Sequence, residues 1–420
     1  MKQLIINAVP YNAAEPTRIL VEDGVVKAVS PTLEDSIATV VDAKGMTVIP
    51  GLVDVHVHFR EPGFEYKETI ATGTQAAASA GYTAVCTMPN LKPTPDSMET
   101  LQIQRNIIER DAKIKVFPYG CITKGQLGAE MADIDAMNPY VCAFSDDGHG
   151  VQKDEMMRSA MLKVKTLGSR IAAHCEVNSL LHNGYIHLGD YAAQHGHRGI
   201  CSQSEWEQIA RDVDLVKETG CQYHVCHIST KESVEIIRNA KKLGLPVSCE
   251  TAPHYLLLTD ADLQEEGRFK MNPPVRSSDD KAALIEGLMD GTIEVIATDH
   301  APHSAEEKSR GLEKSAFGIV GLETAFPLMY TYFVENGRMS LEKLVDVMSH
   351  NPRRLFALGE KVDVAVGSKA DFAFMDLNTN YAINPENFVS KGKATPFAGV
   401  EVHARCCMTM VDGKIVYAAD

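Results

Sequence analysis

The sequence predicts an α/β protein, a (β/α)8 TIM-type barrel with a small β-sandwich formed by the N- and C-terminal segments. Two observations predict the barrel. Apolar strand-like segments recur between Gly51 and Asp299, and helical patterns separate them. Their mean spacing of about 35 residues matches one βα unit. A third observation predicts the sandwich, because strand-like segments return after residue 360.

The expected barrel strands are short apolar runs. No G-x-G-x-x-G motif follows any of them, which argues against an open dinucleotide-binding sheet. Helical patterns fill the intervals, and one of them, at residues 229–244, is opened by Ser229 or Thr230. The eight strands are expected at residues 51–58, 82–88, 114–118, 141–146, 170–175, 222–227, 246–251 and 294–299.

The two ends of the chain have a different character from the middle. Residues 1–50 show short strands joined by tight turns, with a hairpin signal at Asp23-Gly24. Residues 360–420 return to this composition. We therefore expect residues 1–50 and 360–420 to pair as one small β domain beside a barrel formed by residues 51–359.

Composition excludes several classes of protein. Apolar residues make up 45% and charged residues 23%, which is an ordinary globular balance. A formal charge of −15 argues against binding to nucleic acid or to an anionic membrane, because both are held by clustered Lys and Arg. No apolar run is long enough to span a membrane, and no signal-peptide pattern is present, so we expect a cytoplasmic protein.

The first candidate metal ligands lie in residues 50–60, PGLVDVHVHFR. His56 and His58 share one face of a strand, because side chains alternate between faces. Paired imidazoles suit zinc, but they also suit hydrogen bonds in a protein core. Ligand residues at the ends of other strands would favour the metal interpretation, because barrel sites are assembled from several strand ends.

Such residues follow six other expected strands. Catalytic zinc takes three protein ligands and an open position, whereas this rim offers four histidines and two carboxylates that could bind metal, which predicts two metals that share a bridge. Adjacent aspartates face opposite ways in a strand, so spacing does not decide whether Asp146 or Asp147 is that bridge. The residues after the strands are Asn90, Asp146, Asp147, His174, His227, His254, Asp299, His300 and His303.

Six motifs together carry a family resemblance. They resemble the dihydroorotase family of the amidohydrolase superfamily, and more narrowly its long bacterial type (class I), in which an aspartate replaces a carboxylated lysine as the metal bridge. The motifs are DVHVHFREPG (54–63), FSDDG (144–148), AAHCE (172–176), YHVCHIST (223–230), KMNPPVR (270–276) and ATDHAPH (297–303).

The resemblance implies a centre with two Zn²⁺ ions per chain. One ion would be held by His56, His58 and Asp299, the other by His174 and His227, and Asp147 would bridge them. His254 and His300 match no ligand role, so we expect them to support the ligands or to pack around them.

The resemblance also implies the reversible cyclisation of N-carbamoyl-L-aspartate to L-dihydroorotate in de novo pyrimidine (UMP) biosynthesis. Asp299 would move the proton, and Arg60 can hold a substrate carboxylate through two parallel hydrogen bonds. From its composition, the charged segment 304–318 fits a solvated loop, and because it leaves the rim beside His303, a mobile lid is the alternative. The implied substrate contacts are His58, Arg60, Asn90, Asn272, His303, Phe317 and Gly318.

Two other functions stay open. A hydantoinase or allantoinase would share the barrel, although those relatives typically bridge their metals with a carboxylated lysine. A non-catalytic relative would serve as a structural partner of aspartate carbamoyltransferase, although every ligand position is filled here. We expect a homodimer, and an association with aspartate carbamoyltransferase is open even for an active enzyme. The sequence itself does not fix the oligomeric state.

Overall fold

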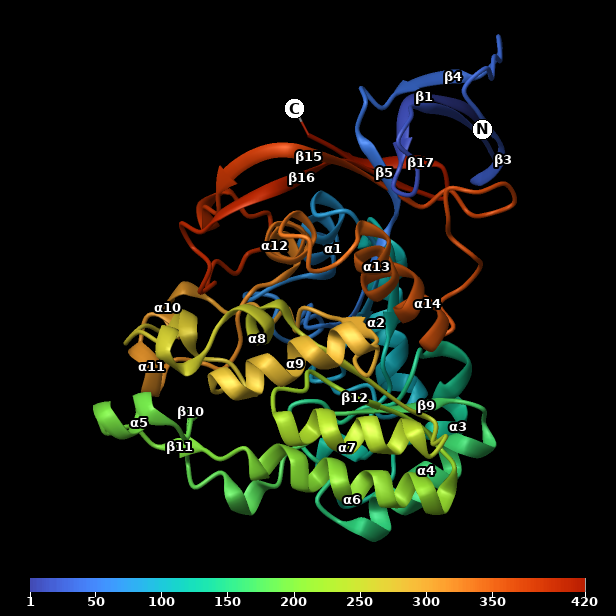
Figure 1. The fold of residues 1–420 in the computed structure, drawn as a ribbon. Helices are drawn as coiled ribbons and strands as arrows, with labels where there is room; N and C mark the ends of the chain where they lie inside the picture. The colour runs from blue at the N-terminus through green and yellow to red at the C-terminus, as the bar shows by residue number, and fades with distance from the viewer. Residues whose placement is uncertain (420) are drawn as a thin grey trace.

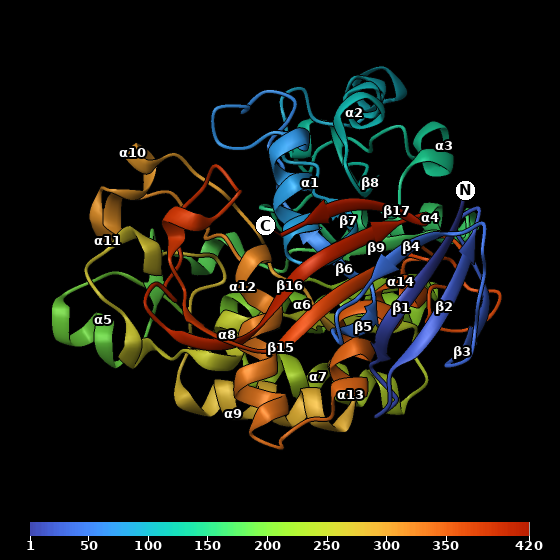
Figure 2. The ribbon, with the colours of Figure 1, turned by 90° about the horizontal axis from the view of Figure 1, so that it is seen from above.

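The structure is a computed structural model that describes residues 1–419. Parallel strands form a barrel, helices surround it, and the two ends of the chain form a small β domain on one side (Figure 1). Figure 2 shows the long strands of this small domain crossing the barrel when the molecule is seen from above.

Seven parallel strands and three single-residue bridges close the barrel. The expected fourth strand is reduced to Phe144, which pairs with Gly120 on one side and Ile171 on the other. The ring closes where Val57 pairs with His300. This closed barrel confirms the predicted fold class. The strands are β6 (Leu52–Val57), β7 (Tyr82–Thr87), β8 (Lys115–Pro118), β9 (Arg170–Ala173), β12 (Gln222–Val225), β13 (Val247–Thr251) and β14 (Val295–Ile296).

Most of the longer helices begin at a hydroxyl residue. Thr69, Ser97, Thr230 and Ser277 accept a backbone N–H from the first turn that follows, so Thr230 is the cap of the helix expected after it. The longer helices are α1 (Ile70–Ser79), α2 (Met98–Asp111), α4 (Asp154–Thr166), α6 (Gln203–Thr219), α7 (Lys231–Lys242), α9 (Ser278–Asp290) and α12 (Leu322–Met329). The shorter ones are α3 (Ile134–Met137), α5 (Asp190–His195), α8 (Pro253–Leu257), α10 (Ala305–Lys308), α11 (Gly311–Lys314), α13 (Leu341–Val345) and α14 (Asn351–Leu355).

The small β domain is one hydrogen-bonded sheet in the order β17-β16-β15-β5-β1-β2-β3, with β4 also paired to β1. β5 runs antiparallel to β15, with Val48 opposite Phe374, so the two ends of the chain meet as predicted. The sheet folds on itself, and Ile5 and Phe372 lie in the same hydrophobic core. The strands are β1 (Lys2–Pro10), β2 (Thr17–Glu22), β3 (Val25–Ser30), β4 (Thr39–Asp42), β5 (Thr47–Pro50), β15 (Phe372–Ala382), β16 (Glu401–Val411) and β17 (Lys414–Ala418).

One feature was not predicted. An arm that holds α5 and the short strands β10 (Ile186–His187) and β11 (Gly199–Ile200) projects from the barrel (Figure 1). The ten cysteines are free thiols. Among residues 1–419, no helix combines the length and the apolar character needed to cross a membrane.

Candidate active site

The six expected metal ligands converge at one end of the barrel. The carboxyl ends of parallel strands meet at the same rim, which brings together residues far apart in the sequence. Each of the six is at most 7% exposed. They are His56 and His58 at the end of β6, Asp147 after the Phe144 bridge, His174 after β9, His227 after β12 and Asp299 after β14.

The Asp147 carboxylate lies at the centre of this cluster. Its Oδ1 is 3.3 Å from His56 Nε2 and 3.5 Å from His227 Nε2, and its Oδ2 is 3.5 Å from His58 Nε2. Asp146 points the other way and accepts the backbone N–H groups of residues 122 and 123. The strand end therefore turns only Asp147 towards the histidines.

Several buried polar atoms of the cluster have no hydrogen-bond partner in the described chain. They include His56 Nε2, Asp147 Oδ1 and His174 Nε2. Buried polar atoms are normally paired, and imidazole nitrogens and carboxylate oxygens are the ligands that zinc prefers. Three groups of described residues have ligand atoms within 4.8 Å of one another, and all three contain His56: one adds His58 and Asp299, another adds Asp147 and His227, and the third adds Cys226 and Glu250. His174 belongs to none of them. The cluster fits metal ions.

Glu250, near the carboxyl end of β13, supports this cluster and was not predicted from the sequence. Its Oε1 lies 2.6 Å from His56 Nδ1 and its Oε2 lies 3.1 Å from His224 Nε2. Burial favours the neutral acid, but the charge of His56 and the hydrogen bonds from both imidazoles hold the pKa of Glu250 well below its usual value. A carboxylate that binds the second nitrogen of a ligand imidazole fixes its orientation. The available signal was a glutamate inside an otherwise buried strand.

Asn90 and Asp54 also accept hydrogen bonds that position the histidines at the end of β6. Asn90 Oδ1 is 2.8 Å from His58 Nδ1, so His58 Nε2 faces the cluster. Asp54 accepts the backbone N–H of His56 (3.0 Å) and of Thr298 (3.2 Å), which joins the first strand to the last. The expected substrate residue Asn90 therefore also orients a cluster histidine.

Arg60 lies beside the cluster with its guanidinium buried. Its Nε donates to Pro302 O (3.3 Å), and Nη2 is 3.3 Å from His303 Nε2. No carboxylate among residues 1–419 lies within 4.0 Å of it, and burial lowers its pKa to about 10. Arg60 also has a φ of 60°, a left-handed conformation that Arg rarely adopts. A buried guanidinium that has no carboxylate partner and lies beside the cluster fits an anionic ligand.

The expected substrate residues His303, Phe317 and Gly318 make hydrogen bonds that involve the backbone of segment 304–318. His303 Nε2 donates to Phe317 O (2.7 Å), while the Gly318 N–H donates to Lys270 O (3.1 Å). Burial and the charges of Arg60 and Lys67 lower the pKa of His303 to about 3, so the imidazole is neutral. Gly318 has a φ of 124°, and a Cβ there would lie 2.7 Å from Ala301 Cβ, which explains the glycine.

Lys308 fastens this segment. Its ammonium donates to Lys270 O (3.0 Å), Ala316 O (2.8 Å) and Gly318 O (2.7 Å), and the residue is 9% exposed. The three N–H bonds of one ammonium thus each have a carbonyl acceptor. The segment contains α10 and α11, so it is folded onto the rim.

Asn272 and His254 complete the rim. Asn272 Nδ2 donates to Glu176 Oε1 (2.8 Å), and Glu176 Oε2 lies 3.7 Å from His174 Nε2. Glu176 was also missed, although it lies within the AAHCE motif. His254 is buried, belongs to no three-ligand group, and burial lowers its pKa to about 4.

Comparison with known proteins gives the family. A family model described as Dihydro-orotase-like matches residues 45–233. The dihydroorotase of Fusobacterium nucleatum subsp. nucleatum is 48% identical over 404 residues, which cover 96% of this chain and 95% of that protein. A dihydroorotase of Staphylococcus aureus is 48% identical over 405 residues, with the same coverage. The chain belongs to the dihydroorotase family.

Dihydroorotases are metal-dependent, and the buried His and Asp cluster accords with this property. Among solved structures, the L-hydantoinase (dihydropyrimidinase) from Arthrobacter aurescens superposes with a TM-score of 0.88 at 28% identity, covering 99% of this chain and 96% of that one. A D-hydantoinase superposes with a TM-score of 0.86 at 24% identity, covering 100% and 95%. The dihydroorotase fold is thus shared with hydantoinases, whereas the sequence is far closer to dihydroorotases.

Proposed function

We propose that the protein is a zinc-dependent dihydroorotase that interconverts N-carbamoyl-L-aspartate and L-dihydroorotate plus water, in de novo pyrimidine biosynthesis. The observation that carries this proposal is the buried, unpaired guanidinium of Arg60 beside a cluster suited to metals. The substrate has both a ring amide to be opened and a carboxylate to be held. The 48% identity to dihydroorotases supports the same substrate.

The proposed metal content is two zinc ions per chain. Asp147 would bridge them, because it faces histidines with both carboxylate oxygens. When bound, zinc would polarise the ring carbonyl and lower the pKa of the attacking water towards neutrality. The remaining ligands would be His56, His58 and Asp299 for one ion and His174 and His227 for the other.

The chain's own residues would move the proton and hold the substrate. In the hydrolytic direction, water adds to the ring carbonyl carbon, and Asp299 accepts its proton. Asp299 then delivers this proton to the ring nitrogen as the C–N bond breaks. Ring closure follows the same steps in reverse. Asp299 lies 3.0 Å from His58 Nε2, which keeps the carboxylate at the centre of the site.

Arg60 would bind the substrate carboxylate through two charge-assisted hydrogen bonds. The Nδ2 groups of Asn90 and Asn272 and the N–H of Phe317 would approach the remaining polar edges, with His58, His303 and Gly318 forming the surrounding wall. Asn272 is already aligned by Glu176. Lys308 would hold the Phe317 and Gly318 backbone against the substrate.

The test is to measure metal content and turnover on one sample. We expect about two zinc ions per chain, with dihydroorotate hydrolysed in preference to hydantoin and allantoin. Preference for hydantoin would favour the hydantoinase alternative, which is the activity named for a structural neighbour. Full zinc content without turnover of any of the three would favour a non-catalytic structural role.

The proposal extends to assembly. We expect a homodimer in the cytoplasm, and light scattering of the purified protein tests the dimer. Association with aspartate carbamoyltransferase is tested by adding that enzyme to the same experiment, where an increase in mass marks a complex.

A further inference from the structure

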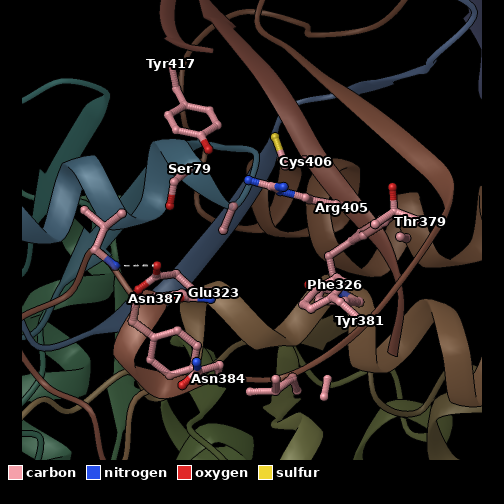
Figure 3. A pocket seen from close by; sticks show the side chains of 17 residues that line it. Ser79, Glu323, Phe326, Thr379, Tyr381, Asn384, Asn387, Arg405, Cys406 and Tyr417 are labelled. Carbon is pink, nitrogen blue, oxygen red and sulfur yellow. Dashed lines mark hydrogen bonds between the residues drawn. The ribbon is translucent and has the colours of Figure 1, made fainter. Parts of the chain in front are cut away.

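A cavity of about 360 Å³ lies between the barrel and the small β domain. Helices α1 and α12 form one wall, and β15 with the turn that follows it (residues 383–389), β16 and β17 form the other (Figure 3). None of the six cluster residues lines it, so it is separate from the candidate active site. Ligand pockets in proteins start at about 300 Å³, so the volume suits a small molecule with one or two rings.

The sheet is opened at this cavity by an irregular register. Asp376 pairs with Arg405, but the next pair is Asn380 with His403, so three residues of β15 face Ala404 alone. Ala404 has a φ of 72°. A left-handed conformation is unfavourable for a residue other than glycine. Such strain and such bulges are concentrated at binding sites, where they re-aim a neighbouring side chain. The neighbour here is Arg405.

Two side chains of the cavity, Arg405 and Asn384, offer hydrogen-bond donors that no acidic group among the described residues accepts. Arg405 forms no ion pair within residues 1–419. Asn384 uses its oxygen to accept the Glu386 N–H, which leaves its Nδ2 group free. The acidic residue on the opposite wall, Glu323, accepts the N–H groups of residues 389 and 390 with its two oxygens (2.7 and 3.1 Å; Figure 3).

Glu323 therefore does not neutralise Arg405. Its two oxygens face the turn, and burial raises its pKa to about 7, which reduces its negative charge at neutral pH. The cavity consequently has one full positive charge, which favours an anion.

Aromatic side chains line the rest of the cavity. Phe326 and Tyr381 lie together below Arg405, and Tyr417 lies on the far side of it (Figure 3). Phe388 adds a fourth ring from the turn. Flat apolar walls accommodate a planar ring by stacking, and the volume excludes a much larger ligand.

We propose that this cavity binds a small anion with a planar ring, whose phosphate or carboxylate group pairs with Arg405 and whose ring packs on the partly exposed rings of Tyr381 and Phe388. The two donors of a guanidinium edge match either acid, so the shared chemistry is a ring with one acidic group. Asn384 supplies an additional donor to the ring or to the acid.

The experiment uses matched ligands on the full-length, metal-loaded protein. Calorimetric titrations compare uridine monophosphate with uridine, and nicotinate with nicotinamide, because each pair differs mainly in its anionic group. We expect at least one anion to bind about tenfold or more tightly than its neutral counterpart. The pair that shows this difference distinguishes a phosphate ligand from a carboxylate ligand.

Variants then locate the site. Arg405→Met should lower the affinity by about tenfold to a hundredfold, and Arg405→Lys by less, because lysine keeps the charge but lacks the fork. Arg338→Met is the matched control, since Arg338 is also exposed and unpaired in the described chain, and it should change nothing. Arg60→Met separates binding at the active site from binding in the cavity.

Two outcomes would overturn the proposal. One is that neither anion binds more tightly than about 1 mM. The other is that the affinity falls in Arg60→Met and not in Arg405→Met, which would place the ligand in the active site. Both Arg405 variants should keep the wild-type melting temperature and dihydroorotate turnover, so a loss of affinity reports the contact itself.

Discussion

The metal side and the substrate side of the candidate active site are held in different ways. On the metal side, the proposed ligands lie at strand ends, and a buried carboxylate can bind the second nitrogen of a histidine, as Glu250 does for His56. On the substrate side, residues lie on loops, and a single ammonium, that of Lys308, holds three backbone carbonyls. Strand-borne residues share the rigidity of the barrel, whereas loop-borne residues depend on a few local contacts.

This difference predicts which property a substitution on each side should change. Changes on the metal side should remove metal and turnover together, because the same atoms serve both. Changes on the substrate side should leave the metal in place and should weaken substrate binding.

Asp147→Asn should lower kcat by more than about 100-fold and should reduce zinc content, because an amide cannot supply two anionic oxygens to a bridge. Asp146→Asn is the matched control. It should keep its metal and lose stability by about 1–3 kcal/mol, because the aspartate accepts N–H groups of a neighbouring loop. Zinc analysis, kinetics and denaturant unfolding check both variants. Loss of metal in Asp146→Asn alone would reverse the assignment.

Arg60→Met should leave zinc content unchanged and should lower kcat/KM for dihydroorotate by about 10- to 150-fold, the effect of 1.5–3 kcal/mol from a charge-assisted pair. For dihydrouracil, which has the ring but not the carboxylate, the same substitution should change kcat/KM little. Equal losses for both substrates would mean that Arg60 supports the structure of the site and does not recognise the acid.

Glu250→Gln should weaken zinc binding by about 10- to 100-fold, because the amide no longer stabilises the orientation of His56 as an anion does. The rate of zinc loss to a chelator measures this effect. Glu176→Gln is the comparison on the substrate side, since Glu176 aligns Asn272. It should change KM more than zinc affinity. The opposite pattern in the two variants would contradict the division between the two sides.

Lys308→Met should raise KM severalfold, with a smaller change in kcat, and should expose segment 304–318 to proteolysis, because three carbonyls lose their donor. Lys308→Arg keeps the charge and should restore part of the affinity. A variant with wild-type KM and an uncut segment would show that the loop is held by other contacts.

The same lysine predicts a dependence on pH. Burial and the neighbouring Lys270 lower the pKa of Lys308 to about 7, so the ammonium is present below pH 7 and is lost as the pH rises through 7. The neutral amine has one N–H fewer for the three carbonyls. KM of the wild type should therefore rise above pH 7, and the ratio of variant to wild-type KM should fall. A constant ratio between pH 6 and 9 would contradict this prediction.

Local patterns in the sequence were sufficient to predict the fold and the residue types that gather at the rim. Side-chain alternation in strands and helical periodicity are local properties, so repeated apolar runs predicted the barrel, and pairing of the two ends followed from their shared composition. The fourth strand was the exception, since its backbone pairs as a strand only at Phe144. The residue types at the strand ends indicated a metal site before any contact was known.

The tertiary structure decided which atoms meet. Asp146 and Asp147 are equivalent in spacing, and only the turn after Phe144 directs one towards the histidines. Glu250 supports His56 across 194 residues, a separation that no local pattern encodes. The carbonyls that accept from Lys308, like the register that strains Ala404, are set by the packing of distant segments. Periodicity is fixed by neighbouring residues, whereas hydrogen-bond partners between strands and loops depend on how the whole chain closes.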